Sequence, residues 1–215
     1  MAFHFARPPG FRHQAGQNML VTLADPPQND AQGPSRTFTI ASAPHEAHLT
    51  VATRMRDSAF KRVLKSAAPG LKVHIDGPAG VMVLHDEAAR PAVFLAGGIG
   101  ITPFLSMARD AVHRRLPHEI TLFYANRRPQ DAAYLEELRA MKGPRLVLTM
   151  GEPPAGWKGE TGFVDRAMIA RHVADPLKPI YYFAGPPAMA MAMQSMLSEF
   201  GVADADMRSE EFYGY

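Results

Sequence analysis

Short segments in which apolar and polar residues alternate fill the first 88 residues of the chain. Alternation with a period of two, together with β-branched residues, is typical of half-buried strands. The strands predicted from this pattern are residues 19–24, 36–41, 48–54, 71–76 and 81–84. Frequent turns separate them, and Ser58 caps a short predicted helix over 59–65. This pattern indicates an antiparallel β-barrel domain over residues 1–88.

The pattern changes after a polar segment, HDEAAR (85–90), which we interpret as a linker. Fully apolar runs now alternate with segments of helical periodicity, as in a parallel sheet covered by helices on both faces. The predicted strands are 92–96, 120–125, 145–150, 180–184 and 207–212, and the predicted helices are the one beginning at Pro103 and those over 131–141, 166–172 and 188–200. We therefore predict an α/β parallel-sheet domain over residues 89–215.

The strand over 92–96 ends in a glycine turn, GGIGITP (97–103). The glycines lack Cβ atoms, so a ligand can approach the backbone closely. Thr102 is the expected cap of the next helix, whose N-terminus offers unpaired N–H groups to an anion such as a pyrophosphate. A second stiff turn, Gly185-Pro186-Pro187, ends the strand over 180–184. The two turns are expected to face one another at the carboxyl ends of the strands, although a strand–turn–helix without a ligand has a similar pattern.

Composition narrows the function classes. The net charge of the 215 residues is +2, which argues against an extended nucleic-acid interface, and no apolar run is long enough to span a membrane. The N-terminus lacks a signal-peptide pattern, so we expect a cytoplasmic protein. Cysteine is absent, which excludes disulfides, cysteine-ligated zinc and a protein-bound iron–sulfur cluster.

The segment Arg36-Thr37-Phe38-Thr39 combines three useful groups. A guanidinium binds phosphate in a forked geometry, an aromatic ring stacks on a planar ligand, and a hydroxyl donates to a ring nitrogen. Taken alone, this tetrapeptide is better explained as a surface arginine beside a half-buried strand.

Five motifs in order together resemble the ferredoxin–NADP⁺ reductase superfamily of flavin reductases. They are RTFT (36–39), GPAG (77–80), GGIGITP (97–103), GPP with Met189 (185–189) and SEEF (209–212). The resemblance covers essentially the whole chain. It implies an FAD-binding barrel followed by a nucleotide-binding domain, with flavin and nicotinamide meeting at the junction.

On the flavin side, the resemblance implies that Arg36 binds the FAD pyrophosphate, Phe38 lies against the flavin and Thr39 places its hydroxyl near flavin N5. Thr37 belongs to the same motif, and the expected phosphate shell comprises Thr53, Arg54, Ser58 and Lys61. Phe38 replaces the family's usual Tyr and Thr39 its Ser. Met82 stands where an aromatic residue is common, so FMN remains an alternative to FAD.

On the nicotinamide side, the resemblance implies that Gly97, Gly98, Gly100 and Thr102 hold the NAD(P)H pyrophosphate. Gly185, Pro186 and Met189 would bound the nicotinamide pocket. Glu210 and Phe212 would lie near the flavin, with Tyr213 or Tyr215 as competing aromatic covers. Arg127 follows the second strand of this domain and favours the 2′-phosphate of NADPH, while NADH remains an alternative because NADH-using relatives also carry an arginine here.

The implied function is hydride transfer from NAD(P)H to flavin N5, followed by single-electron transfer to a separate ferredoxin, flavodoxin or oxygenase component. Thr39 would stabilise N5 and Glu210 would tune or relay protons. Basic residues would contact the acceptor, with Arg12, Arg54, Arg56, Lys61 and Arg62 as candidates. The alternatives are a flavin-binding electron-transfer subunit of a larger complex that does not turn over NAD(P)H alone, and a non-catalytic binding module.

Overall fold

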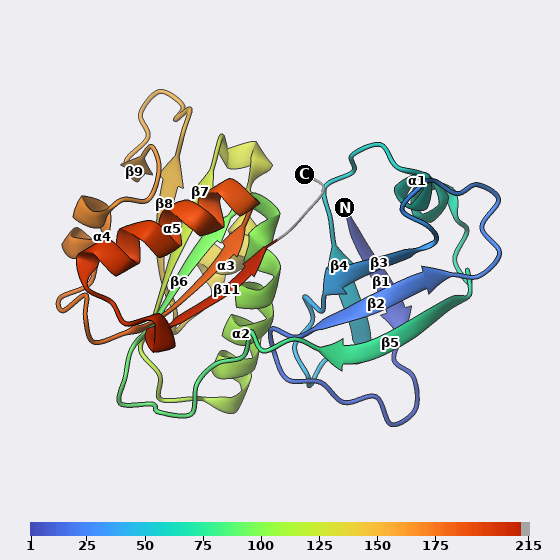
Figure 1. The fold of residues 1–215 in the computed structure, drawn as a ribbon, viewed down its shortest axis with the longest axis horizontal. Helices are drawn as coiled ribbons and strands as arrows, with labels where there is room; N and C mark the ends of the chain where they lie inside the picture. Colours follow the sequence, from blue (N-terminus) through green and yellow to red (C-terminus); the bar gives the residue numbers. More distant parts are fainter. Residues whose placement is uncertain (212–215) are drawn as a thin grey trace.

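The first part of the chain forms two antiparallel sheets around one apolar core in the computed structural model, which describes residues 1–211 (Figure 1). Strand β1 (Ala2–Ala6) pairs with β4 (His48–Ala52), and β2 (Asn18–Leu23) lies between β3 (Ser35–Thr39) and β5 (Val73–Ala79). Helix α1 (Ala59–Ser66) contributes Phe60, Val63 and Leu64 to the core that these strands share. Ser58 caps α1 by accepting from the Lys61 N–H at 3.2 Å, as predicted.

The second part is a six-stranded parallel sheet with the order β11-β10-β6-β7-β8-β9. These strands are β6 (Ala92–Gly97), β7 (Ile120–Asn126), β8 (Arg145–Met150), β9 (Glu160–Thr161), β10 (Ile180–Gly185) and β11 (Met207–Glu211). One face packs against α2 (Ile101–Arg114) and α3 (Leu135–Ala140), and the other against α4 (Arg166–His172) and α5 (Pro187–Phe200). Because helices cover both faces, every residue of β6 and β10 is buried. The predicted fold class is confirmed.

Four elements differ from the prediction: β1, β9, the strand expected over 81–84 and the helix expected over 131–141. Strand β1 was not predicted, although Phe3 and Phe5 alternate with His4 and pack on the barrel core. The strand predicted over 81–84 does not form, because the chain leaves β5 at Gly80 and buries Met82 in the core beside α2.

The helix predicted over 131–141 forms only as α3, because Tyr134 is left-handed (φ 57°) and separates α3 from the 3₁₀ turn Pro129–Asp131. Two further short 3₁₀ turns, Gly98–Gly100 and Asp204–Asp206, precede α2 and β11.

The two antiparallel sheets with α1, which we call the barrel, contact the parallel-sheet part of the chain directly. The loop after β3 rests on α2, where the Ser106 hydroxyl donates to the Ser42 carbonyl at 2.8 Å. Arg109 of α2 donates to the Ala41 carbonyl and bonds Glu46 on the barrel side and Glu137 of α3. The chain crosses between the two parts after β5 and before β6, and the domain boundary at residue 88 stays a prediction. Among residues 1–211, no helix is both long and apolar enough to cross a membrane.

Candidate functional site

A cleft of about 620 Å³ opens between the barrel and the parallel sheet. Strand β3, the segment after β4, the start of α1, the glycine turn and β11 all contribute side chains to it. Among its lining residues are the flavin-side residues predicted from the sequence: Arg36, Thr37, Phe38, Thr39, Thr53, Arg54, Ser58, Lys61 and Glu210. The fold therefore brings residues from four separate segments to one cleft.

Arg36 and the first turn of α1 together hold an anion. The Arg36 guanidinium bonds the Asp30 carboxylate at 2.9 Å, and the Ala59 N–H donates to the other Asp30 oxygen at 3.0 Å. Partial burial raises the pKa of Asp30, but the hydrogen bonds from Arg36, Ala59 and Gln32 outweigh it and hold the pKa below its ordinary value. A guanidinium beside a helix N-terminus is a donor set that suits a phosphate group. The residues present therefore fit the pyrophosphate of a flavin dinucleotide, with Asp30 now occupying these donors.

The cleft also carries surplus positive charge. Lys61 lines it together with Arg36 and Arg56, and its ammonium donates to the Arg54 carbonyl at 2.8 Å. Burial first, and then repulsion from Arg56 and Arg36, lowers the pKa of Lys61. A bound anion would relieve this repulsion. The cluster therefore favours a ligand with negative charge at this end of the cleft.

Two buried oxygens in the cleft lack hydrogen-bond partners within the described chain, namely Thr39 Oγ1 and Glu210 Oε2. Thr39 is 3% exposed and lies opposite Asn18 in the β2–β3 register. The Asn18 amide donates to Glu210 Oε1 at 2.9 Å and so links the barrel to β11. Burial raises the pKa of Glu210 despite this hydrogen bond. Buried polar atoms are normally paired, so both oxygens are suited to meet polar atoms of a ligand.

Phe38 presents an aromatic surface to the cleft. Its ring lies 5.8 Å from that of Phe60 at an interplanar angle of 38° and packs against the barrel core. The ring is thus held from behind, which suits it to contact a planar ligand.

The glycine turn packs against the GPP turn, as predicted from the sequence. A Cβ added to Gly97 would lie 2.2 Å from Met189 Sδ, and one added to Gly100 would lie 2.2 Å from the Ala184 carbonyl oxygen. Gly185 lies against Gly97 and Met189, and Pro186 against Gly97. The predicted nicotinamide-side residues therefore gather at the carboxyl ends of β6 and β10, apart from Thr102 and Arg127.

Arg54 connects this turn to the cleft. Gly98 has a φ of +55°, and a Cβ on it would lie 2.8 Å from the Arg54 guanidinium. The same guanidinium reaches the Asp131 carbonyl at 3.5 Å. Arg54 thus spans the barrel and the nucleotide side, which sequence motifs did not indicate.

Thr102 does not cap α2, contrary to the prediction. The helix begins at Ile101, two residues earlier than predicted, and Thr102 is 1% exposed with its hydroxyl donating to the Ile99 carbonyl at 3.1 Å. The start of α2 is buried against the sheet, and the Thr102 hydroxyl is used within the fold.

Arg127 and Arg128 share one carboxylate. Glu152, just beyond β8, bonds Arg127 Nε at 2.6 Å and Arg128 Nε at 2.7 Å. These hydrogen bonds, that from Arg127 first, lower the pKa of Glu152. A carboxylate therefore stands where the sequence pattern indicated only arginines.

Asp30 and Glu152, which loops bring to the site, were not predicted from the sequence, and neither was Asn18 at the start of β2. Met82, which stands where an aromatic residue is common in the family, is 3% exposed in the core beside α2. Phe212, Tyr213 and Tyr215, the predicted aromatic covers, lie outside the described residues.

Residues 94–195 match the family model of the oxidoreductase NAD-binding domain. The chain is 30% identical over 157 residues to NADH-cytochrome b5 reductase 1 of Aspergillus terreus, covering 68% of this chain and 53% of that protein. It is 25% identical over 210 residues to the terephthalate 1,2-dioxygenase reductase component 2 of Comamonas sp, covering 94% and 60%.

Among solved structures, a ferredoxin NADP⁺ reductase from Neisseria gonorrhoeae with bound FAD and NADP superposes with a TM-score of 0.82. The sequence identity is 19%, and the match covers 98% of this chain and 91% of that one. The chain spans about half the length of the curated relatives that it matches.

Proposed function

Because the chain is ferredoxin–NADP⁺ reductase-like in fold and in its NAD-binding domain, as the motifs indicated, we propose that it is an FAD-dependent oxidoreductase. It oxidises NAD(P)H and passes electrons to a separate one-electron acceptor. The observation that carries the proposal is one cleft in which an anion site, an aromatic ring and two unpaired buried oxygens meet beside a glycine turn. Bound FAD supplies the chemistry, since a flavin accepts a hydride and releases electrons singly.

The chain's own residues bind and orient the cofactor in this proposal. Arg36 and the α1 N-terminus exchange the Asp30 carboxylate for the FAD pyrophosphate. Phe38 would support the flavin ring, and the Thr39 hydroxyl, which has no partner in the described chain, would hydrogen-bond its N5 edge. Glu210 is suited to hold a proton near the same edge, because burial raises its pKa and leaves Oε2 unpaired.

The nicotinamide donor is NADH in this proposal. A ribose 2′-hydroxyl donates to a carboxylate, whereas a 2′-phosphate is repelled by one. Glu152 places a carboxylate between the two arginines that would otherwise favour NADPH. The relative from Aspergillus terreus carries NADH in its name, which agrees with this choice.

The acceptor is a ferredoxin, a flavodoxin or an oxygenase component. The relative from Comamonas is a reductase component of a dioxygenase, and it matches nearly the whole chain. A solved ferredoxin reductase of carbazole 1,9a-dioxygenase has the same fold, with a TM-score of 0.75. The described residues hold no cysteine for a cluster, so the one-electron centre belongs to another protein or domain.

The visible spectrum, followed by anaerobic titration with NADH and with NADPH, tests the proposal. We expect a yellow protein that NADH bleaches at lower concentration than NADPH. A yellow protein bleached by neither nucleotide would indicate an electron-transfer subunit that requires its complex. A colourless protein that takes up neither FAD nor FMN would refute the assignment.

A further inference from the structure

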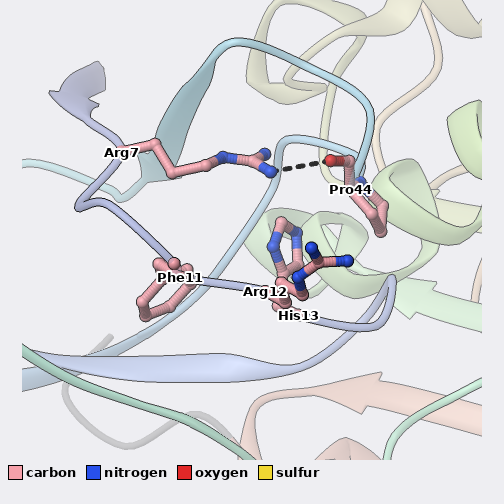
Figure 2. Close-up of a pocket in the computed structure, with 6 residues that line it drawn as sticks. Arg7, Phe11, Arg12, His13 and Pro44 are labelled. Atoms are coloured by element: carbon pink, nitrogen blue, oxygen red, sulfur yellow. Dashed lines mark hydrogen bonds between the residues drawn. The ribbon is translucent and has the colours of Figure 1, made fainter.

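A second cavity, of about 490 Å³, lies on the barrel beside the loop that rests on α2. Six residues line it, and none of them lines the proposed flavin cleft: Arg7, Gly10, Phe11, Arg12, His13 and Pro44. Figure 2 shows the guanidinium groups of Arg7 and Arg12 extending toward Pro44, while the ring of Phe11 lies away from Pro44, below the Arg7 side chain in this view. Of these residues, only Arg12 has been named above, as a candidate contact for the electron acceptor, and none takes part in the proposed cofactor cleft.

The lining carries two cations and no carboxylate. Arg7 donates to the carbonyls of Pro44 at 2.8 Å and Glu46 at 2.6 Å, and its buried Nε has no partner in the described chain. Within residues 1–211, Arg7 forms no salt bridge and the Arg12 side chain forms no hydrogen bond. The nearby Glu46 carboxylate is bound to Arg109 and to the Ala43 N–H. The lining itself therefore contains no carboxylate that could pair with Arg7 or Arg12.

His13 adds an unsatisfied polar atom to the same wall. It is 8% exposed, its Nε2 pairs with the Ser42 carbonyl at 3.2 Å, and its Nδ1 has no partner among the described residues. Burial lowers the pKa of His13, and of the charges that face it Arg7 lowers it further while Asp110 and Glu46 raise it. The imidazole is therefore neutral near pH 7. Its Nε2–H donates to the Ser42 carbonyl and its Nδ1 is an acceptor, so a hydroxyl of a ligand suits Nδ1 and only the two arginines attract an anion.

The segment that carries these residues is stiff. Pro8 and Pro9 precede Gly10 (φ +78°), and the Phe11 N–H closes the turn on the Pro8 carbonyl at 3.0 Å. Arg7 is held by its hydrogen bonds to the carbonyls of Pro44 and Glu46, which lie in the loop between β3 and β4. Prolines and closed turns restrict the free chain, so little further order is lost when a ligand binds.

We propose that this cavity binds a small oxyanion, a phosphate or carboxylate group held between Arg7 and Arg12. A guanidinium binds either oxyanion through forked, charge-assisted hydrogen bonds, and the Arg12 side chain has no competing partner in the described chain. Arg7, whose Nη1 and Nη2 already donate to carbonyls, adds positive charge beside it. The ring of Phe11 and Pro44 form apolar walls for the body of such a ligand. An adjoining cavity shares His13 and Pro44 but contains Asp86 and Asp110, so the anionic group belongs at the Arg7 end.

Calorimetric titration of the full chain with inorganic phosphate and with benzoate, at matched ionic strength, tests the site. In Arg12→Gln we expect the Kd of whichever anion binds to rise at least about tenfold, because one of two guanidinium groups is lost. Arg12→Lys keeps the charge but not the forked guanidinium, so its Kd should lie between those of the wild type and of Arg12→Gln. Arg139→Gln, on the exposed face of α3, is the control for surface charge.

Two further variants and one spectrum separate this site from the proposed cofactor cleft. If phosphate binds in the cofactor cleft instead, Lys61→Gln or Arg128→Gln would weaken its binding and Arg12→Gln would not. That result would overturn the proposal. So would the absence of binding by either anion up to about 10 mM. The imidazole ¹⁵N signals of His13 should shift on titration with the anion that binds, which an effect of Arg12 on folding alone would not produce.

Discussion

The Thr39 hydroxyl is the smallest group on which the proposed chemistry depends. It is buried, faces the cleft and has no partner in the described chain. Thr39→Ala removes it while Arg36, Ser58 and Phe38 remain to bind the flavin. We expect flavin reduction by NADH to slow about tenfold, which corresponds to about 1.4 kcal/mol in the barrier, with flavin still bound.

Thr39→Ser is the matched control, because it keeps the hydroxyl and removes only a methyl group. Stopped-flow absorbance under anaerobic conditions measures the reduction rate of both variants. Equal rates for wild type and Thr39→Ala would remove Thr39 from the proposed mechanism.

Glu210 makes stability depend on pH. Burial raises the pKa of its carboxyl from the ordinary value of 4.5. Between that value and the higher pKa of the folded state, the folded protein keeps a proton that the unfolded chain releases. The free energy of unfolding therefore falls as pH rises through this interval, with a limiting slope of about 1.4 kcal/mol per pH unit.

Glu210→Gln stays neutral and can still accept from Asn18, so it should lack this dependence. Urea unfolding from about pH 5 to about pH 8 should show the variant gaining stability relative to wild type as pH rises. Glu199→Gln, on α5, provides the comparison for a carboxylate at an exposed site. Parallel profiles for wild type and Glu210→Gln would contradict the assigned cause.

At the scale of elements, two helix caps allow an effect on stability to be told apart from an effect on cofactor binding. In each, the capping side chain accepts from the N–H three residues later. Ser58 accepts from the Lys61 N–H at 3.2 Å, and Asp165 accepts from the Met168 N–H at 2.7 Å. Each change to alanine should lower the free energy of unfolding by about 1 kcal/mol. Only Ser58 lines the cleft, so only Ser58→Ala should also weaken FAD binding. Urea unfolding and FAD titration measure the two effects, and equal FAD affinity in both variants would exclude Ser58 from the cofactor site.

The segment after β8 governs nucleotide choice in our proposal. Glu152→Gln removes the carboxylate and frees the charges of Arg127 and Arg128 for a 2′-phosphate. We expect the ratio of kcat/KM for NADPH to that for NADH to rise about tenfold. Steady-state kinetics with an artificial acceptor measure the ratio, and Glu136→Gln on α3 serves as the control. An unchanged ratio would mean that Glu152 does not control nucleotide choice, and Arg127 would again be expected to favour the 2′-phosphate of NADPH.

The local pattern of apolar and polar residues predicted most elements. It failed where contacts between residues distant in the sequence determine the conformation. The apolar runs of β6 and β10 are read directly, since both faces of the parallel sheet are covered. Residues 81–84 alternate like a strand, but Met82 is drawn into the core beside α2 and no partner strand exists among the described elements. Asp30 and Glu152 were not predicted because Ala59 is 29 positions from Asp30 and Arg128 is 24 from Glu152, and only the folded loops bring these pairs together.

For the whole molecule, the contact between barrel and parallel sheet sets where the flavin and nucleotide sides meet. Arg109 of α2 is central to it: its side chain is 18% exposed and bonds Glu46, Glu137 and the Ala41 carbonyl. Burial lowers the pKa of Arg109, but its two carboxylate partners outweigh this and raise it. Helix α2 starts at the glycine turn, and the loop that Arg109 holds follows β3, which carries Thr39. One side chain thus ties together both halves of the proposed site.

Arg109→Met should therefore lower the free energy of unfolding by about 2 kcal/mol, because Glu46 and Glu137 lose their shared cation. It should also slow flavin reduction, since the nucleotide turn and the flavin cleft lose a fixed relation. Arg139→Gln breaks an exposed pair on α3 and should change the free energy of unfolding by less than about 1 kcal/mol. Urea unfolding and stopped-flow reduction of both variants decide the matter. If Arg109→Met loses stability but reduces flavin at the wild-type rate, the contact stabilises the fold without setting the geometry of the site.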